Sequence, residues 1–261
     1  MIESLNSPHV ARVKALIGSK GTRERRAAGE FVAEGMQCFR EAIATNNGPR
    51  ISTLYLTAAS RVKLDEVTDL SLLQTYDVSE EVMRAMSETI TPQGILAICA
   101  MPKTSLETIS LNGSRTFIYL SEIQDPGNAG TILRSADAFG MDAVITSPGS
   151  VDMYSPKVVR STAGSLWHIP VFESIELQEL LANKPLHAFT LGAGGTRKLS
   201  EFTITGDCVA IFGNEARGLT TDKSLTSIES IQIPMPGSAE SLNLSAAASI
   251  VMYHLSNMRT S

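Results

Sequence analysis

Residues 233–255 read IPMPGSAESLNLSAAASIVMYHL, and the organisation of the whole chain can be worked out from this stretch. It begins at the end of an apolar, β-branched run, where Pro234 and Pro236 prevent a strand or a helix from continuing. Ser241 or Asn243 can cap the helix that follows, because each side chain offers an oxygen to the unpaired N–H groups of a first turn. The stretch therefore predicts a strand end, a polar loop and a C-terminal helix.

The predicted helix carries little side-chain bulk on one face, because three alanines and a serine occupy 246–249. Such a face lets another backbone approach closely. A helix start with free N–H groups beside a polar loop also favours an anionic or carboxylate ligand. A surface loop before an amphipathic helix would give the same pattern, since capping residues are common to most helices. On its own, this stretch leaves both interpretations open.

Bulk composition is that of an ordinary globular protein. The 261 residues suit one large or two modest domains, and a hydrophobic share of 43% is ample for a core. The sequence lacks both a run of ~20 apolar residues and a secretory leader, so we expect a cytoplasmic protein with no membrane partner. The 3 cysteines form no CxxC pair and the 4 histidines lie far apart, so we expect neither a disulfide framework nor a metal site.

Positive charge is concentrated at the start of a chain whose formal net charge is −5. Before Ala27, Glu3 and Glu24 stand against the basic residues Arg12, Lys14, Lys20, Arg23, Arg25 and Arg26. A basic arm on an acidic protein favours contact with nucleic-acid phosphates, and a solvated helix face is the alternative. Aromatic residues make up only 5% of the chain, so a base-stacking platform is not evident.

Alternating strand and helix patterns predict two domains. Residues 1–29 form a basic, helical arm, residues 30–101 a compact α/β domain, and residues 102–115 a polar linker. In the 30–101 domain, strands are expected at 31–33, 51–56, 73–78 and 95–100, and helices at 36–44, 61–67 and 80–87.

Residues 116–261 form the second alternating series. Strands are expected at 116–120, 143–146, 187–191, 209–212 and 230–233, and helices at 129–139, 155–163, 177–182 and 244–258. Apolar strands separated by helices predict a parallel sheet covered on both faces. Ligands of such sheets bind beyond the carboxyl ends of the strands, which is where the loop of 233–243 begins.

A second stretch, LSEIQDPGNAGTILRSADAFG at 120–140, reaches the same sheet edge. Its DPGN sequence is typical of a turn, and Asn128 can cap the helix that follows. Arg134 comes six residues later among small and apolar neighbours. Its guanidinium needs an anion, either the carboxylate of Asp137 or Glu122 or a ligand phosphate.

A third stretch, IFGNEARGL at 211–219, places Glu215 between Gly213 and Gly218. A carboxylate held by such a turn is available to a ligand or to a neighbouring arginine. The GAGG sequence at 192–195 could mimic a nucleotide-binding loop, but Arg197 occupies the last glycine position of GxGxxG. The sequence therefore disfavours a dinucleotide site, and it contains no P-loop spacing.

DPGNAGTILRSADAFG, FGNEARGL and IPMPGSAESLNLSAAASIVMYHL resemble, in order and separation, the three motifs of the SpoU/TrmH family of RNA 2′-O-ribose methyltransferases. FVAEGMQCFREAI near the start resembles the L30e-like substrate-binding domain of that family. The resemblance implies an α/β fold with a C-terminal SPOUT-type parallel sheet, a deep trefoil knot and a smaller N-terminal L30e-like domain. Knots are so rare in proteins that sequence physics alone would not predict one.

The resemblance also implies S-adenosylmethionine as methyl donor, bound largely by backbone groups, and a homodimer through the C-terminal domain. By motif, the cofactor contacts would be Gly213, Ile233 and Leu242, with Leu191, Gly192 and Met235 as further contacts. The residues that match the polar active-site positions are Asn128, Arg134, Glu215, Ser241 and Asn243. The basic arm and residues 30–100 would hold the RNA.

The expected substrate is 23S rRNA, because the separate N-terminal domain resembles that of rRNA-directed members; a tRNA is the alternative. A relative that binds RNA without catalysis is disfavoured by the intact polar positions. A nicotinamide or nucleotide enzyme that uses the 192–195 loop is disfavoured by the missing fingerprint. A role in resistance to a ribosome-targeting drug, known for some relatives, stays open.

Overall fold

The computed structural model describes all residues except 67, 193, 215–227 and 260–261. The chain divides into two compact units, Met1–Lys103 with Tyr154–His168, and Thr104–Met153 with Ile169–Ser261. The first division, after Lys103, falls within the stretch predicted as a linker at 102–115. Residues 154–168, which we predicted to be part of the C-terminal domain, belong to the first unit instead.

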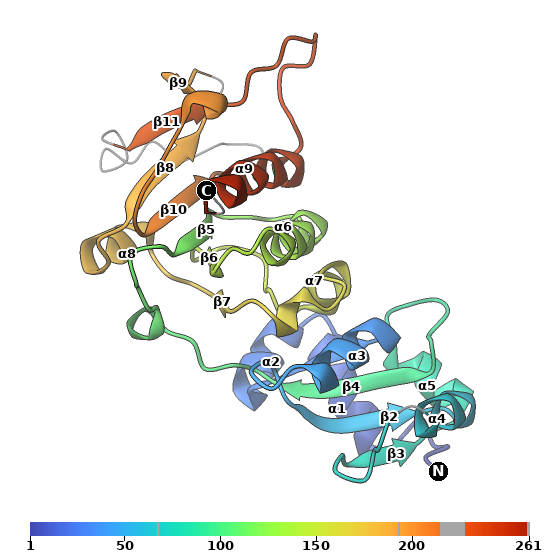
Figure 1. Cartoon of the computed structure of the whole chain (residues 1–261). Coiled ribbons are helices and arrows are strands. Elements are labelled where there is room, and N and C mark those ends of the chain that lie inside the picture. The colour runs from blue at the N-terminus through green and yellow to red at the C-terminus, as the bar shows by residue number, and fades with distance from the viewer. Residues whose placement is uncertain (67, 193, 215–227, 260–261) are drawn as a thin grey trace. The chain divides into compact units, whose positions relative to one another are not determined.

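The first unit contains a four-stranded mixed sheet in the order β1-β4-β2-β3 (Figure 1). Its strands are β1 (Glu30–Glu34), β2 (Ile51–Leu56), β3 (Thr75–Asp77) and β4 (Ile95–Ala100). Strand β4 runs antiparallel to both of its neighbours, whereas β2 and β3 are parallel. All four lie where the apolar runs of the sequence predict strands.

Helices cover this sheet. They are α1 (Pro8–Ile17), α2 (Gly21–Ala28), α3 (Met36–Ala44), α4 (Ala58–Asp65), α5 (Glu80–Met86) and α7 (Pro156–Ser161), and a 3-10 turn spans Ser165–Trp167. Helix α1 shows why they form. Ser7 caps it by accepting from the His9 amide, and Val10, Val13 and Leu16 recur every three residues and are buried in the core.

Large aromatic side chains explain why residues 154–168 belong to the first unit. The Phe31 ring lies 5.1 Å from the Tyr154 ring and 6.1 Å from the Trp167 ring, centroid to centroid. The Trp167 indole donates a hydrogen bond to the Pro49 carbonyl at 2.9 Å. Rings of this size bury much apolar surface, so the segment packs with the first unit although its neighbours in sequence belong to the second.

The second unit contains a seven-stranded sheet in the order β7-β6-β5-β10-β8-β11-β9, and every neighbouring pair is parallel. Its strands are β5 (Thr116–Leu120), β6 (Ala143–Thr146), β7 (Val171–Phe172), β8 (His187–Leu191), β9 (Arg197–Lys198), β10 (Cys208–Phe212) and β11 (Glu229–Gln232). The predicted parallel sheet is confirmed. The sequence did not reveal β7 and β9, because two-residue strands carry no periodicity.

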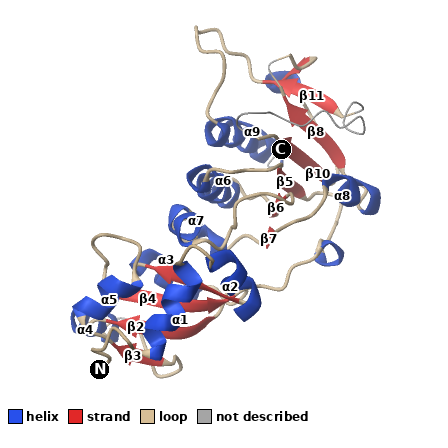
Figure 2. Ribbon diagram, turned by 180° about the vertical axis from the view of Figure 1, so that it is seen from behind, coloured by secondary structure: helices blue, strands red, loops and turns tan. Residues whose placement is uncertain are grey.

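Helices α6 (Pro126–Ala138) and α9 (Leu244–Arg259) pack side by side on one face of this sheet, and α8 (Leu177–Asn183) covers the other (Figures 1 and 2). Short 3-10 turns lie at Leu106–Thr108 and Leu199–Glu201. All residues of the central strands β5 and β10 are buried, as expected for strands covered on both faces.

The last three expectations about the fold concern the trefoil knot, a membrane span and a metal site. The chain path through 215–227 lies outside the described residues, so the trefoil knot stays a prediction. Among the helices that the structure describes, none is long and apolar enough to span a membrane. Within the same residues, no group of three or more His, Cys, Asp or Glu side chains is placed to hold a metal ion.

Candidate active site

A pocket of about 720 Å³ lies in the second unit at the carboxyl ends of β8, β10 and β11 and the start of α9. Because the strands are parallel, the loops that leave them meet at one edge of the sheet. The residues that line the pocket are Gln124, Asp125, Asn128, Leu191, Gly192, Phe212, Gly213, Asn214, Ile233, Met235, Glu240, Ser241, Leu242, Asn243, Leu244 and Ala247.

The structure brings most of the predicted site residues to this pocket. The six residues expected to contact a cofactor all line it: Leu191, Gly192, Gly213, Ile233, Met235 and Leu242. The expected polar residues that line it are Asn128, Ser241 and Asn243. The sequence did not single out Gln124, Asp125, Phe212, Asn214 or Glu240, although each lies within a few positions of a predicted residue. Their closeness in sequence to the predicted site residues was the signal that could have found them.

Two helix starts form the polar side of the pocket. Asp125 caps α6, since its Oδ1 accepts the Asn128 amide hydrogen at 2.7 Å and Pro126 occupies the first helical position. Our expectation that Asn128 caps this helix was therefore wrong. Asn243 fills the corresponding role at α9, where its Oδ1 accepts from the Ser245 amide at 2.9 Å. Of the two candidate caps for α9, the structure selects Asn243.

The side chains of Asn128 and Asn243 join the first and third sequence motifs. Asn243 Nδ2 donates to Asn128 Oδ1 at 3.1 Å across 115 positions of chain. Behind this contact, Ser135 Oγ and Ser249 Oγ are 2.8 Å apart where α6 meets α9. The small side chains at 246–249 allow that close approach, as the sequence indicates. Both asparagines line the pocket.

The turn between β5 and α6 is held in an unusual backbone conformation. Glu122 has a φ of 48°, which is uncommon for a residue other than glycine. The Glu122 amide donates to Ser147 Oγ at 2.7 Å, and its carbonyl accepts from Asn214 Nδ2 at 2.9 Å. Gln124 Nε2 also donates to the Gly149 carbonyl at 2.7 Å. Hydrogen bonds to residues that follow β6 and β10 therefore hold the turn after β5 in place. An uncommon backbone conformation such as that of Glu122 is often found at functional sites.

Two matching models identify the family. The SpoU rRNA Methylase family model matches residues 115–253, and a model of the MRM3-like substrate binding domain matches residues 8–97. The chain belongs to the SpoU rRNA methylase family. The resemblance of its three motifs to this family is therefore confirmed.

Full-length relatives of this SpoU methylase are known. The chain is 32% identical to the 23S rRNA (guanosine(2553)-2′-O)-methyltransferase RlmP of Bacillus subtilis (strain 168), over 97% of this chain and 98% of that protein. It is 28% identical to the 23S rRNA (uridine(2479)-2′-O)-methyltransferase of Streptomyces viridochromogenes, over 95% and 89% respectively.

A solved structure extends the likeness to the fold. The crystal structure of the SpoU methyltransferase AviRb from Streptomyces viridochromogenes, in complex with AdoMet, matches with a TM-score of 0.85 and 26% identity. The match covers 98% of this chain and 99% of that one. The α/β fold with its parallel sheet and smaller N-terminal domain is therefore that of the SpoU methyltransferases.

The pocket of this SpoU methylase fits S-adenosylmethionine. Its volume of about 720 Å³ lies in the range of small-molecule sites. Leu191, Phe212 and Ile233 give part of its wall an apolar surface, of the kind against which an aromatic ring can pack. At Gly192, which also lines the pocket, a Cβ atom would lie only 3.0 Å from Ser230 Oγ, so a side chain there would crowd the neighbouring strand β11.

Of the predicted catalytic residues, Arg134 is not among the described residues that line the pocket. Glu215 lies outside the described residues, so its contacts are not described. Arg134 lies exposed on α6, and no hydrogen bond or ion pair joins it to another described residue. The alternative in which Asp137 or Glu122 neutralises Arg134 is therefore not seen in the described part of the chain.

The predicted basic arm is a helical pair in which the basic residues differ in accessibility. Lys14, Lys20, Arg23 and Arg26 are exposed. Arg12 is partly exposed and binds both carboxylate oxygens of Glu30, at 2.5 and 2.6 Å.

Arg25 does not fit the expectation that it contacts RNA. It is 3% exposed, and its guanidinium donates to the Leu16 carbonyl and to Thr22 Oγ1. The side chain therefore satisfies the C-terminal end of α1 and is inaccessible to a phosphate.

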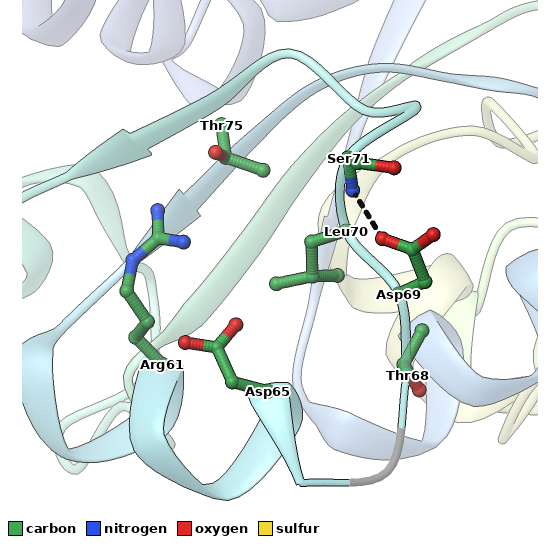
Figure 3. Close-up of a pocket in the computed structure, with 7 residues that line it drawn as sticks. All are labelled: Arg61, Asp65, Thr68, Asp69, Leu70, Ser71 and Thr75. Carbon is green, nitrogen blue, oxygen red and sulfur yellow. Dashed lines mark hydrogen bonds between the residues drawn. The ribbon is translucent and has the colours of Figure 1, made fainter.

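A second pocket, of about 620 Å³, lies in the first unit between α4 and β3 (Figure 3). Arg61 and Asp65 on α4 face Leu70 and Thr75 across it. The backbone amide of Ser71 donates to Asp69 at 2.9 Å, and this hydrogen bond lowers the pKa of that carboxyl. None of the described residues of the three motifs lines this pocket, so the candidate active site is the pocket of the second unit.

Proposed function

We propose that this chain is an S-adenosylmethionine-dependent methyltransferase that methylates a ribose 2′-hydroxyl of 23S rRNA. The observation that carries the proposal is that described residues of three family motifs, from 120–140, 211–214 and 233–255, line one pocket of suitable size. Membership of the SpoU rRNA methylase family supports the same reaction.

The residues proposed to hold the methyl donor are Leu191, Gly192, Gly213, Ile233, Met235 and Leu242. When bound, S-adenosylmethionine supplies a methyl group that its sulfonium has already activated. The protein therefore needs mainly to orient the acceptor sugar and to help its hydroxyl lose a proton. We propose that the linked amides of Asn128 and Asn243, with the hydroxyl of Ser241, hold the ribose beside the pocket that these residues line.

Arg134 is proposed to bind the phosphate beside the acceptor ribose. A guanidinium stays protonated and is a poor base, but its positive charge lowers the pKa of a nearby hydroxyl. Glu215 is proposed to orient this guanidinium. The exposure of Arg134, without a described protein partner, leaves its donors available to RNA.

We also propose a homodimer through the second unit, with the site near its interface. Ile250 and Tyr253 on α9 are 40% and 58% exposed, and the Tyr253 ring meets Phe139 at the end of α6. An exposed apolar strip beside the helix that carries Arg134 is suited to a second copy of the chain.

The first unit is proposed to hold the RNA. Lys14, Lys20, Arg23 and Arg26 offer four exposed cations on α1 and α2 and the adjoining turn. Such residues bind phosphates without reading sequence, so they give affinity rather than choice of nucleotide. Residues 30–101 are proposed as the L30e-like body of the substrate-binding domain, and residues 116–261 as the knotted methyltransferase domain.

The choice of 23S rRNA over tRNA rests on two full-length relatives, those of Bacillus subtilis and Streptomyces viridochromogenes, whose names specify 23S rRNA. They name different nucleotides, a guanosine and a uridine, so the proposal does not extend to the base. The reaction is placed in the cytoplasm, as the sequence leads us to expect.

Transfer from methyl-labelled S-adenosylmethionine tests the proposal. Unmodified 23S rRNA and total tRNA are incubated separately with the protein, and the products are digested to nucleosides. We expect a labelled 2′-O-methyl nucleoside from the 23S rRNA alone. Label on a base, or in tRNA only, contradicts the proposal.

A further inference from the structure

The charged side chains that the structure describes around the candidate active site are acidic. Among its described lining residues, Asp125 and Glu240 are the ionisable ones. Asp125 is committed to the start of α6, where it accepts the Asn128 amide hydrogen. Glu240 is exposed, and it has neither a hydrogen bond nor an ion pair with another residue that the structure describes. Its carboxylate is therefore available to whatever occupies the pocket.

The proposed reaction changes the charge of the molecule in this pocket. The bond between sulfur and the methyl carbon breaks while a bond forms between that carbon and the ribose 2′-oxygen. The electron pair of the broken bond stays on sulfur, and the hydroxyl proton passes to solvent. S-Adenosylmethionine thus becomes S-adenosylhomocysteine, which lacks one methyl group and one positive charge.

We propose that Glu240 is a specificity-determining residue that makes the pocket hold the cationic methyl donor more tightly than the neutral product. The inference rests on the proposed function. A carboxylate on the pocket wall attracts a sulfonium and has no comparable attraction for a thioether. Because the charge disappears in the transfer step, the same residue that favours donor binding also favours release of the product.

The size of the effect follows from Coulomb's law. For unit charges several ångströms apart in a partly solvated pocket, one carboxylate changes an affinity about fivefold. Salt screens such an interaction, because the Debye length falls from ~8 Å at physiological ionic strength to ~3 Å at 1 M. The preference for the donor is therefore expected to shrink as salt rises.

Calorimetry with three ligands tests this assignment on the full-length protein. The ligands are S-adenosylmethionine, S-adenosylhomocysteine and sinefungin, an analogue whose protonated amine replaces the charge of the sulfonium group. In Glu240→Gln, we expect about fivefold weaker binding of the two cationic ligands and unchanged binding of S-adenosylhomocysteine. Glu240→Lys is expected to weaken the cationic ligands further, so that the product becomes the preferred ligand.

Glu179→Gln is the matched control, because Glu179 is exposed on α8 and is not among the residues that line the pocket. It is expected to bind all three ligands like the wild type. An equal loss for all three ligands in Glu240→Gln, or no loss for any, overturns the inference and leaves the methyltransferase proposal intact. If the wild type binds none of the three, the proposed function fails and the inference falls with it.

Discussion

The side chain of Asn243 has two roles, to cap α9 and to bind Asn128, and two substitutions distinguish them. Its Oδ1 caps α9 by accepting from the Ser245 amide and hydroxyl, at 2.9 and 2.6 Å. Its Nδ2 donates to Asn128 at 3.1 Å. Asn243→Ala removes both functions. Asn243→Ser retains a capping oxygen but is too short to reach Asn128.

Loss of an N-cap costs about 1 kcal/mol, and loss of an exposed amide hydrogen bond adds about 0.5 kcal/mol or less. We therefore expect Asn243→Ala to lower the free energy of unfolding by about 1–1.5 kcal/mol, and Asn243→Ser to lower it by about 0.5 kcal/mol or less. If the linked amides hold the acceptor ribose, both variants lose methyl transfer by about tenfold or more, since each 1.36 kcal/mol is tenfold in rate.

Urea denaturation and transfer of labelled methyl to 23S rRNA measure the two effects on the same samples. Methyl transfer by Asn243→Ser at the wild-type rate would refute the proposal that the Asn243 amide holds the acceptor ribose. An Asn243→Ala variant as stable as the wild type would refute the capping argument.

Three other predictions follow from single side chains. Arg134→Ala is expected to abolish methyl transfer while calorimetry finds nearly unchanged S-adenosylmethionine affinity, and unchanged turnover would contradict its role. Arg25→Ala is expected to lower the free energy of unfolding by about 2 kcal/mol, because the Leu16 carbonyl loses its hydrogen-bond donor. Arg23→Ala is expected to weaken RNA binding and to leave the free energy of unfolding unchanged. A loss of stability in Arg23→Ala, or a loss of RNA binding alone in Arg25→Ala, would contradict the structural role of Arg25. Burial raises the pKa of the Cys38 thiol from 9.0 to about 11, so the stability that this thiol contributes is present below pH 9 and is lost as the pH rises toward 11. Between these pH values, the urea midpoint of denaturation should therefore fall less for Cys38→Ala than for the wild type. Parallel plots of midpoint against pH for the two proteins would contradict this prediction.

Much of the fold was readable because its signals are local. Runs such as 117–120 and 208–212 are apolar throughout, and strands buried on both faces need that composition. The site was readable because parallel strands end at one edge, so loops from three of them meet there. The family motifs then named most of the residues that line the pocket.

The parts that could not be read from the sequence depend on contacts between distant residues. Nothing near Trp167 indicates that its ring packs with Phe31 and bonds to Pro49, so residues 154–168 were predicted to be in the wrong unit. Arg25 looks like its exposed neighbours in sequence, and only the return of α2 onto α1 buries it. Asp125 rather than Asn128 caps α6, because Pro126 fixes the start of that helix one turn earlier.

Three separated loops are proposed to form one pocket for the methyl donor. A crystal structure of the protein with bound S-adenosylmethionine tests this arrangement. We expect density for the ligand between Gly192, Gly213 and Leu242, with its methyl group directed toward Asn128 and Asn243. Density for the ligand at any other place, such as the pocket beside Arg61 in the first unit, would contradict it.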